Sequence, residues 1–348
     1  MKAKYCRYVL KFRHPAGTSR GVLHEKETFF IKLYDDENPE KFGIGECAVF
    51  RGLSADDVPD YESRLADLCR NIENDDLTDL TEYPSMMFGL QSAIYDYSGG
   101  CNRILFPSEF TAGESGIPIN GLVWMGTKDE MLLRIKDKIK AGFTTIKLKV
   151  GAIDFDSEIE LVKYIRRNFP EEALTIRLDA NGGFSPDVAL ERLEQLSKFG
   201  IHSIEQPIKA GQWDTMCDLC KNSPIDIALD EELIGIFTPE KMGEMLTTIK
   251  PKYIILKPSL VGGFSGAQMW MQQAAARGIG GWITSALESN IGLNAIAQWT
   301  AMLGADMPQG LGTGALYTNN IGSPLEVVGQ SLVYDPNGKW DIPELDWK

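Results

Sequence analysis

Residues 144–150 read Thr-Thr-Ile-Lys-Leu-Lys-Val, and this alternating stretch decides the fold. Successive side chains of a β-strand point to opposite faces, so Ile146 and Leu148 share one face. Lys147 and Lys149 share the other face. Two lysines in this pattern are normal on the solvated face of an edge strand. A strand inside a closed parallel barrel has no solvated face, and in that setting both lysines point into the barrel.

The chain on both sides of this stretch alternates short apolar strands with amphipathic helical segments. The predicted strands cover residues 117–124, 144–150, 174–179, 203–206, 226–230, 253–257 and 281–285, with a weaker eighth at 309–311. Repeated strand–helix units imply a parallel sheet, and about eight units over roughly 200 residues predict an α/β fold with a (β/α)8-type barrel. An open doubly wound sheet is the alternative, but the glycine-rich loop at 310–314 comes too late in the chain to be its phosphate-binding loop.

The texture of the sequence divides the chain into three parts. Residues 1–112 mix alternating and helical patterns, which predicts an α+β capping domain. Glycine and proline gather between residues 98 and 115, so the boundary is expected there, and residues 113–315 hold the barrel. The tail at 316–348 contains no further strand–helix unit and is expected to pack on the capping domain and complete it.

Composition and charge restrict the partners. The chain has 348 residues, and 35 basic against 49 acidic side chains give a formal net charge of −14. This charge argues against nucleic acid and against an anionic membrane surface as partners. The first residues form no signal-peptide core and no stretch approaches a membrane span, so a cytoplasmic location is expected. Six cysteines are too few for a disulfide framework, and Cys217 and Cys220 are interpreted as buried helix cysteines.

Ionisable residues stand at the carboxyl ends of five successive predicted strands. In chain order they are Lys149, Asp179, Glu205, Asp230 and Lys257. Consecutive members are separated by about one strand–helix unit, so each is expected at the same height on its own strand, at the end of the barrel where such folds place their active sites. A single residue of this kind is compatible with a structural ion, whereas five in register favour a functional site.

The residue types define the chemistry. Asp179, Glu205 and Asp230 would repel one another and need a counter-charge to stay ionised when buried together. An all-oxygen ligand set suits Mg²⁺, and no cysteine or histidine stands at these positions to favour a softer metal. Close to other cations, Lys149 is expected to lose part of its preference for the ammonium form and to act as a base. Lys257, on the far side, is expected to supply a second positive charge or a second acid–base group.

At these residues the sequence resembles the enolase superfamily, in its muconate-lactonizing subgroup. The similarity includes the Lys147-x-Lys149 pair, the three carboxylates, Lys257, and the segment 43–54, which the resemblance implies is a lid over the barrel mouth. The resemblance also implies that Lys149 takes a proton from the carbon beside a substrate carboxylate. The metal would then stabilise the resulting enediolate, with Lys257 as a further positive charge.

Three further segments, at 177–181, 284–292 and 310–314, resemble a branch of the subgroup that forms an aromatic ring in menaquinone synthesis. The resemblance implies a small-molecule carboxylate as substrate, a cyclohexadiene that carries a hydroxyl group and a succinyl chain. It implies a syn-dehydration in which Lys149 removes the proton and then, as its ammonium form, helps the hydroxyl group to leave. The candidate substrate contacts are Lys147, Arg177, Ser285 and Gly312.

Several alternatives stay open at this stage. An N-acylamino acid racemase or a dipeptide epimerase on the same scaffold would use Lys149 and Lys257 as bases on opposite faces of the substrate. The last barrel strand carries no Asp-x-Asp pair for an ammonium group, which counts against a dipeptide. A Schiff-base aldolase needs a lysine but not three carboxylates. A scaffold without activity has no reason to keep all five residues, and the chain is compatible with a homo-oligomer.

Overall fold

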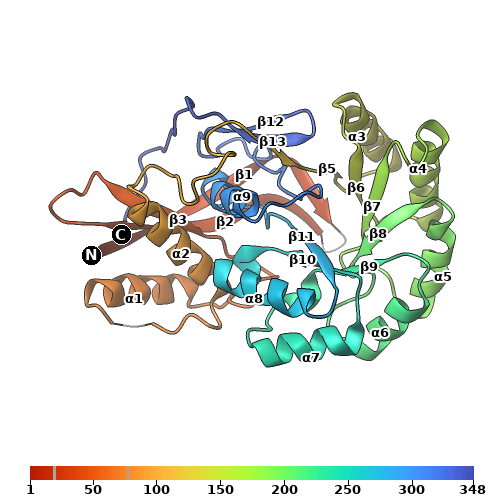
Figure 1. The fold of residues 1–348 in the computed structure, drawn as a ribbon, viewed down its shortest axis with the longest axis horizontal. Helices are drawn as coiled ribbons and strands as arrows, with labels where there is room; N and C mark the ends of the chain where they lie inside the picture. Colours follow the sequence, from red (N-terminus) through yellow and green to blue (C-terminus); the bar gives the residue numbers. More distant parts are fainter. Residues whose placement is uncertain (19–20, 77) are drawn as a thin grey trace.

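The computed structural model describes residues 1–18, 21–76 and 78–348. An antiparallel sheet opens the chain, with its strands in the order β1 (Lys2–Thr18), β2 (Gly21–Tyr34) and β3 (Phe42–Cys47). Two helices follow the sheet, α1 (Tyr61–Glu73) and α2 (Pro84–Ser98). In Figure 1 these two helices lie toward the left end of the molecule, where both ends of the chain also lie.

The two faces of this first sheet pack in different directions. Phe29 and Ile31 of β2 are buried on one face and share a core with Tyr61 of α1. Phe30 lies between them in the sequence, so its side chain points to the opposite face. There it is fully buried and packs in a second core that includes Ile291, from the barrel part of the chain. The sheet is therefore held on both sides, by its own helices and by the barrel.

A parallel sheet forms the second part, and its seven strands lie in the order β11-β10-β9-β8-β7-β6-β5. The strands are β5 (Gly121–Val123), β6 (Thr145–Lys149), β7 (Thr175–Asp179), β8 (Ile201–Glu205), β9 (Ile227–Leu229), β10 (Tyr253–Leu256) and β11 (Gly280–Ile283). The helices that follow them in turn are α3 (Lys128–Lys140), α4 (Phe155–Asn168), α5 (Pro186–Ser197), α6 (Trp213–Asn222), α7 (Pro239–Ile249), α8 (Gly263–Ala275) and α9 (Asn290–Met302). Figure 1 shows the helices from α3 to α7 on the outside of the curved sheet.

A very short eighth segment closes the barrel. Gln309 bridges Ile119, and Gly310 bridges Thr284, both in parallel orientation. The segment therefore joins the β5 side of the sheet to the β11 side, and the expected α/β barrel is confirmed. The eighth strand that the sequence predicts is present only as these two bridges. Residues 311–348 are all described, and they form no helix after it.

The strand that the sequence predicts at 117–124 is divided in two. Its first part is β4 (Ile117–Pro118), which pairs with β13 (Ser331–Tyr334), itself paired with β12 (Leu325–Val328). Only β5 joins the barrel sheet. Proline has no backbone N–H and interrupts a ladder of hydrogen bonds, which explains the break at Pro118. Its carbonyl oxygen instead accepts from the backbone N–H of Gln309 (2.8 Å), next to the barrel closure.

The end of the chain lies along the first strand. The backbone N–H of Lys348 donates to the carbonyl of Tyr5 (2.9 Å), and the N–H of Tyr5 donates back to Lys348 (3.3 Å). The Trp347 ring packs edge-on against Phe42 of β3, with the ring centroids 6.2 Å apart. These contacts attach the tail to the N-terminal sheet.

Two further features of the sequence, its apolar segments and its cysteines, can be checked against the structure. No helix in the described ranges is long and apolar enough to cross a membrane. All six cysteines carry free thiols, and Cys217 and Cys220 lie together on α6, where both are half-buried and not fully buried as the sequence interpretation has it. Burial raises the pKa of Cys220 to about 12. Its thiol therefore stays protonated at neutral pH and is a poor nucleophile or metal ligand.

Candidate active site

Five charged residues stand in one row at the carboxyl end of the barrel strands. Lys149, Asp179 and Glu205 are the last residues of β6, β7 and β8. Lys149 pairs with Asp179, and Asp179 pairs with Glu205, across adjacent strands. Asp230 and Lys257 directly follow β9 and β10. All five side chains are buried, so the strand register places them together in the interior.

Lysines and carboxylates contact one another directly in this row. Lys147 Nζ lies 2.8 Å from Asp179 Oδ2 and 2.5 Å from Glu205 Oε2. Lys149 Nζ donates to Asp179 Oδ2 (2.6 Å) and to Asn181 Oδ1 (2.7 Å). Both lysines point into the barrel, as the alternation of their strand predicts, and each amine has two acceptors.

Burial and neighbouring charges shift the three lysines in different ways. Burial by itself lowers the pKa of a lysine, because it disfavours the charged form. For Lys147, burial is outweighed by its two carboxylate partners, and the pKa is raised. For Lys149, burial prevails over the attraction of Asp179, and Lys147 adds repulsion, so the pKa is lowered. Lys257 donates to Asp230. The charges of Asp230, Glu205 and Glu231 together outweigh burial and raise the pKa of Lys257.

The backbone turns sharply just beyond two of the carboxylates. Asn181 has φ 44° and Gln206 has φ 40°, both in the left-handed region. They follow Asp179 and Glu205 closely in the sequence. Asparagine tolerates this conformation better than most residues, whereas glutamine is held there at a cost of about 1–3 kcal/mol. Gln206 Nε2 donates to the carbonyl of Ile208 (3.0 Å), which helps to hold the turn.

Of the three carboxylates in the row, Glu205 has an oxygen without a hydrogen-bond partner among the described residues. Its Oε1 is buried and has no hydrogen-bond partner in the described chain. Burial, together with the charges of Asp179 and Asp230, raises the pKa of Glu205 to about 8 although Lys147 acts against the shift. An unsatisfied carboxylate oxygen beside two further carboxylates fits a hard divalent cation. Among the described residues, no three acidic, histidine or cysteine side chains form a ready-made ligand cluster, and Lys147 instead bridges two of the carboxylates.

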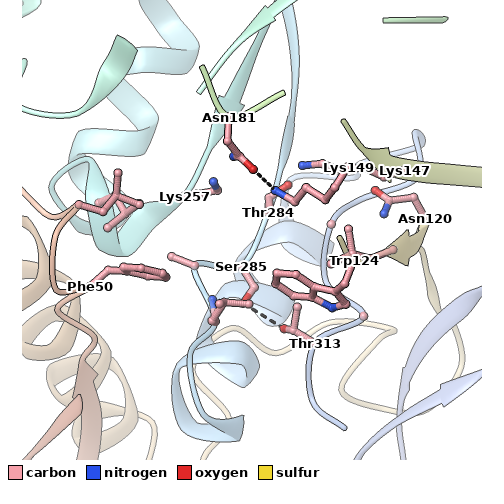
Figure 2. A pocket seen from close by; sticks show the side chains of 17 residues that line it. Phe50, Asn120, Trp124, Lys147, Lys149, Asn181, Lys257, Thr284, Ser285 and Thr313 are labelled. Carbon is pink, nitrogen blue, oxygen red and sulfur yellow. Dashed lines mark hydrogen bonds between the residues drawn. The ribbon is translucent and has the colours of Figure 1, made fainter. Parts of the chain in front are cut away.

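Two members of the row, Lys149 and Lys257, line a cavity, which Figure 2 shows from close by. Asp179, Glu205 and Asp230 are not among the described residues that line it. Its polar lining includes Lys147, Lys149, Asn181, Lys257, Ser285 and Thr313. Its apolar lining includes Phe50, Leu53, Leu122, Trp124, Leu260 and Leu287. Lys149 and Lys257 belong to β6 and to the end of β10, which lie four strands apart in the sheet. They therefore reach the cavity from opposite sides of the barrel, as Figure 2 shows.

Three of the four candidate substrate contacts line this cavity, namely Lys147, Ser285 and Gly312. Thr313 donates to Ser285 Oγ (3.0 Å), so these two hydroxyl groups form one polar patch on the cavity wall. The patch comes from the loop after β11 and from the segment that follows the barrel closure. The Ser285 hydroxyl also donates to Glu288 and accepts from the backbone N–H of Leu287, so the protein itself fixes its orientation.

Arg177, the fourth candidate, is not among the residues that line the cavity. It lies two residues before Asp179 on β7, deeper in the barrel. Its Nη1 donates to the carbonyl of Pro308 (2.7 Å), and its guanidinium lies 4.0 Å from the centroid of the Trp282 ring. Burial lowers the pKa of Arg177 to about 10. These contacts give Arg177 a place in the barrel interior, and we leave it out of the substrate contacts proposed below.

Other cavity residues received no role from the sequence. Asn181 accepts a hydrogen bond from Lys149. It comes two residues after Asp179, and this period-two spacing could have marked it as a residue of the same site. The Trp124 ring lies 6.0 Å from Lys149 Nζ and stands beside it in Figure 2. Phe50 comes from the N-terminal part of the chain, from the segment that the resemblance implies is a lid. No local pattern marks Trp124 or Phe50 as cavity residues rather than core residues.

Comparison with known proteins places the chain in a family. Residues 130–328, more than half of the chain, match the family model described as enolase C-terminal domain-like. The chain therefore belongs to the enolase superfamily, as the resemblance implied. It is 46% identical to the o-succinylbenzoate synthase of Desulfotalea psychrophila, over 95% of this chain and 98% of that protein. It is 30% identical to the L-Ala-D/L-Glu epimerase of Bacillus subtilis, over 85% of this chain and 83% of that protein.

Solved structures agree with this assignment. MenC from Desulfotalea psychrophila LSv54 superposes with a TM-score of 0.85 at 43% identity, and the match covers 96% of this chain and 99% of that one. The muconate lactonizing enzyme from Pseudomonas fluorescens superposes with a TM-score of 0.78 at 20% identity, covering 98% and 96% of the two chains. The second similarity concerns the fold alone, and it agrees with a barrel joined to an N-terminal sheet.

Proposed function

We propose that this chain is a Mg²⁺-dependent o-succinylbenzoate synthase. Such an enzyme is a hydro-lyase that removes water from a succinyl-hydroxycyclohexadiene carboxylate and leaves an aromatic ring, a step of menaquinone synthesis. The observation that carries the proposal is the cavity that Lys149 and Lys257 line from opposite sides, each as the ion-pair partner of a buried carboxylate, Asp179 or Asp230. The similarity to the o-succinylbenzoate synthase of Desulfotalea psychrophila, over nearly the whole chain, supports the same reaction.

Lys149 is assigned the role of the base. Its Nζ lines the cavity and is oriented by hydrogen bonds to Asp179 and Asn181. In its neutral form it takes the proton from the ring carbon beside the carboxylate. As its ammonium form it then gives that proton to the departing hydroxyl group. One C–H bond and one C–O bond break, a ring double bond forms, and water leaves from the face of the ring next to Lys149.

Lys257 is assigned an electrostatic role. It enters from the opposite wall, and its ion pair with Asp230 keeps it charged. A fixed positive charge there stabilises the negative charge that develops on the substrate carboxylate when the proton is removed. Asp179, Glu205 and Asp230 would hold Mg²⁺, which supplies further positive charge beside the same carboxylate.

The rest of the cavity is assigned to the ring and the succinyl chain. Trp124 and Phe50 offer flat apolar surfaces of a size that suits a six-membered ring. Ser285 and Gly312 are proposed to contact the succinyl end, and Lys147 to compensate charge near the carboxylate. Residues 309–314 supply no carboxylate to this wall, which disfavours a substrate with a free ammonium group.

The proposal includes an organisation of the chain and a setting. Residues 1–112 and 316–348 would form the capping domain, with its lid near residues 43–54, and residues 113–315 the barrel. The partner would be a small-molecule carboxylate, and neither nucleic acid nor a membrane is expected to bind. A cytoplasmic location follows from the same proposal, and cell fractionation tests it. Gel filtration would report whether the chain forms a homo-oligomer.

The direct test is an absorbance assay. Purified protein is mixed with the cyclohexadiene precursor, with and without Mg²⁺, and the ultraviolet absorbance is followed as the ring becomes aromatic. Rapid loss of the precursor signal with Mg²⁺, stopped by EDTA, is the expected result. If folded protein with Mg²⁺ leaves the precursor unchanged, the synthase assignment is rejected. Deuterium exchange at the α-carbon of N-acylamino acids would then test the racemase alternative.

A further inference from the structure

A second buried charge cluster lies outside the cavity, between the N-terminal sheet and the loop after β11. Its members are Lys26 on β2, Glu46 on β3 and Glu288 in the loop. Glu46 and Glu288 are completely buried, and Lys26 is only 5% exposed. Burying two carboxylates together is costly unless each is hydrogen-bonded and a cation is near. None of the three takes part in the proposed reaction, so the cluster needs another explanation.

Glu288 ties together the loops that follow two neighbouring barrel strands. Its Oε1 accepts from the hydroxyl of Ser259 (2.5 Å), which lies two residues after Lys257. Its Oε2 accepts from the hydroxyl of Ser285 (2.6 Å) and from the backbone N–H of Ala286 (2.7 Å). One carboxylate therefore fixes both the loop that begins at Lys257 and the loop whose Ser285 lines the cavity.

Glu46 fastens the same region to the N-terminal sheet. Its carboxylate accepts from the backbone N–H and the hydroxyl of Ser289 (3.0 and 2.6 Å) and from the N–H of Gly292 (3.0 Å). Ser289 caps the start of α9, where the unpaired N–H groups and the helix dipole favour negative charge. Thr28 on β2 donates to Glu46 Oε1 (2.8 Å), the oxygen that also accepts from the Ser289 N–H, which completes the link to the sheet.

Lys26 is the basic member of the cluster. Its Nζ is buried and has no hydrogen-bond partner in the described chain, and burial lowers its pKa although Glu46 and Glu288 act against the shift. The packing around the two carboxylates is close. A Cβ added to Gly292 would lie 2.7 Å from Glu288 Cβ and 2.8 Å from Glu46 Oε2. A glycine at this position lets both carboxylates approach the first turn of α9.

We propose that Glu288 is a positioning residue: its carboxylate sets the placement of Ser285 for substrate binding and, through Ser259, the placement of Lys257 for charge stabilisation, while Glu46 fixes the adjacent Ser289. The inference rests on the proposed function only for the roles of Ser285 and Lys257. It makes the cavity wall depend on the docking of the N-terminal sheet, because Glu46 of the sheet binds Ser289, the residue that directly follows Glu288.

The contacts on the two oxygens of Glu288 make the idea testable. Methionine has a similar length but accepts no strong hydrogen bond, so Glu288→Met removes the contacts to both loops. Ser259→Ala removes only the contact on the side of Lys257 and creates little empty space. Steady-state kcat and KM for the cyclohexadiene precursor are measured for both variants and for the double variant. The controls are Glu244→Met, at an exposed position, and Ser197→Ala, at a half-buried position at the end of α5.

The contact to Ser259 should affect kcat, and the contact to Ser285 should affect KM. Ser259→Ala should lower kcat about tenfold and leave KM within about twofold, because it disturbs Lys257 and not Ser285. Glu288→Met should lower kcat at least as far and also raise KM about tenfold. The double variant should lose no more kcat than Glu288→Met alone, because one shared contact is removed in both. A folded Glu288→Met variant with kcat and KM within twofold of the wild type overturns the inference, and so do fully additive losses.

Hydrogen exchange keeps the inference separate from the proposed function. Mass spectrometry follows the peptides at 257–261 and 284–289, and both should exchange faster in Glu288→Met while peptides of α3 to α5 stay unchanged. If Glu288→Met does not fold, Glu288→Gln takes its place, with the same directions and smaller effects. If the wild type itself does not convert the precursor, the proposed function fails and the exchange data judge the inference. Unchanged exchange in both loops of the folded variant then overturns it.

Discussion

Lys147 and Lys149, two residues apart on β6, contact the same oxygen of Asp179, at 2.8 Å and 2.6 Å. Their second partners differ. Lys147 has the carboxylate of Glu205, whereas Lys149 has the neutral amide of Asn181. One amine is therefore surrounded by negative charge on two sides, and the other faces an uncharged group next to the cavity. In the proposed reaction, this difference in partners lets Lys147 compensate charge and Lys149 exchange a proton.

Replacing Lys149 by alanine should stop the reaction and leave the fold intact. A general base contributes about 10²–10⁴-fold to a rate, so kcat should fall at least about a hundredfold. Asp179 keeps Lys147 as a partner, so the thermal unfolding midpoint should stay close to that of the wild type. Lys163→Ala, on the exposed side of α4, is the control. Near-normal turnover by Lys149→Ala would mean that the base is elsewhere.

Replacing Asp230 by asparagine should weaken Mg²⁺ binding. The substitution keeps the shape of the side chain and removes one of three negative charges, and affinity for hard cations depends on the charge of the ligands. Calorimetric titration with MgCl₂, without substrate, should give a dissociation constant at least about tenfold higher. Asp218→Asn on the exposed side of α6 should bind like the wild type. Equal affinity in both variants would remove Asp230 from the ligand set.

Replacing Arg103 by methionine should destabilise the joint between α2 and β3. Its Nη1 donates to the completely buried Asp96 and to the carbonyl of Phe42 (2.7 Å). Removing the cation leaves a buried carboxylate without compensation, which costs about 3–5 kcal/mol. Denaturant unfolding measures the loss, and Arg64→Met, which breaks an exposed pair with Asp60, should cost much less. Equal effects of the two variants would contradict a buried ion pair.

Glu158 on α4 gives a pH-dependent prediction. It is completely buried and accepts from the backbone N–H of Gly151 (2.6 Å), and burial raises its pKa from 4.5 to about 7. The native state therefore holds this proton more tightly than the unfolded chain. Its contribution to stability is fully present below pH 4.5 and is lost as the pH rises to about 7.

A neutral side chain at this position should remove that loss. Glu158→Gln should exceed the wild type in unfolding free energy by up to about 3 kcal/mol at pH 8 and differ little near pH 4.5. Thermal unfolding at the two pH values measures the difference, with the exposed Glu160→Gln as the control. A difference that does not change with pH would show that Glu158 titrates normally.

The alternation in β6 and the even spacing of the charged residues made the barrel and its row of charges predictable. Both signals are local, because side-chain direction follows from the strand period and height follows from the length of a strand–helix unit. The same rules place Arg177 inside the barrel, and the sequence prediction made it a substrate contact. Its actual partners, Pro308 and Trp282, are more than a hundred residues away in the chain. No local pattern reveals them.

The links between the two parts of the chain lie beyond sequence reasoning for the same reason. Glu46 and Ser289 are 243 residues apart, and their hydrogen bonds form only when the first sheet meets α9. The GIGE motif at 43–46 carried part of the family resemblance, but the pattern alone did not predict that its glutamate would cap a barrel helix. The split of the predicted strand at Pro118 was, by contrast, available from the missing N–H of proline.

The short closure of the barrel has a consequence for how this enzyme can evolve. The wall between β5 and β11 is made by the backbone of Gln309 and Gly310, and a Cβ at Gly310 would lie 2.3 Å from Thr284 Oγ1. A side chain at position 310 would therefore collide with Thr284, and this position leaves little room for change. Selection for another substrate therefore has to act on side chains such as Trp124 and Phe50, which come from other segments. The closure at Gly310 therefore tolerates few substitutions, whereas substitutions at Trp124 and Phe50 can change the shape of the cavity.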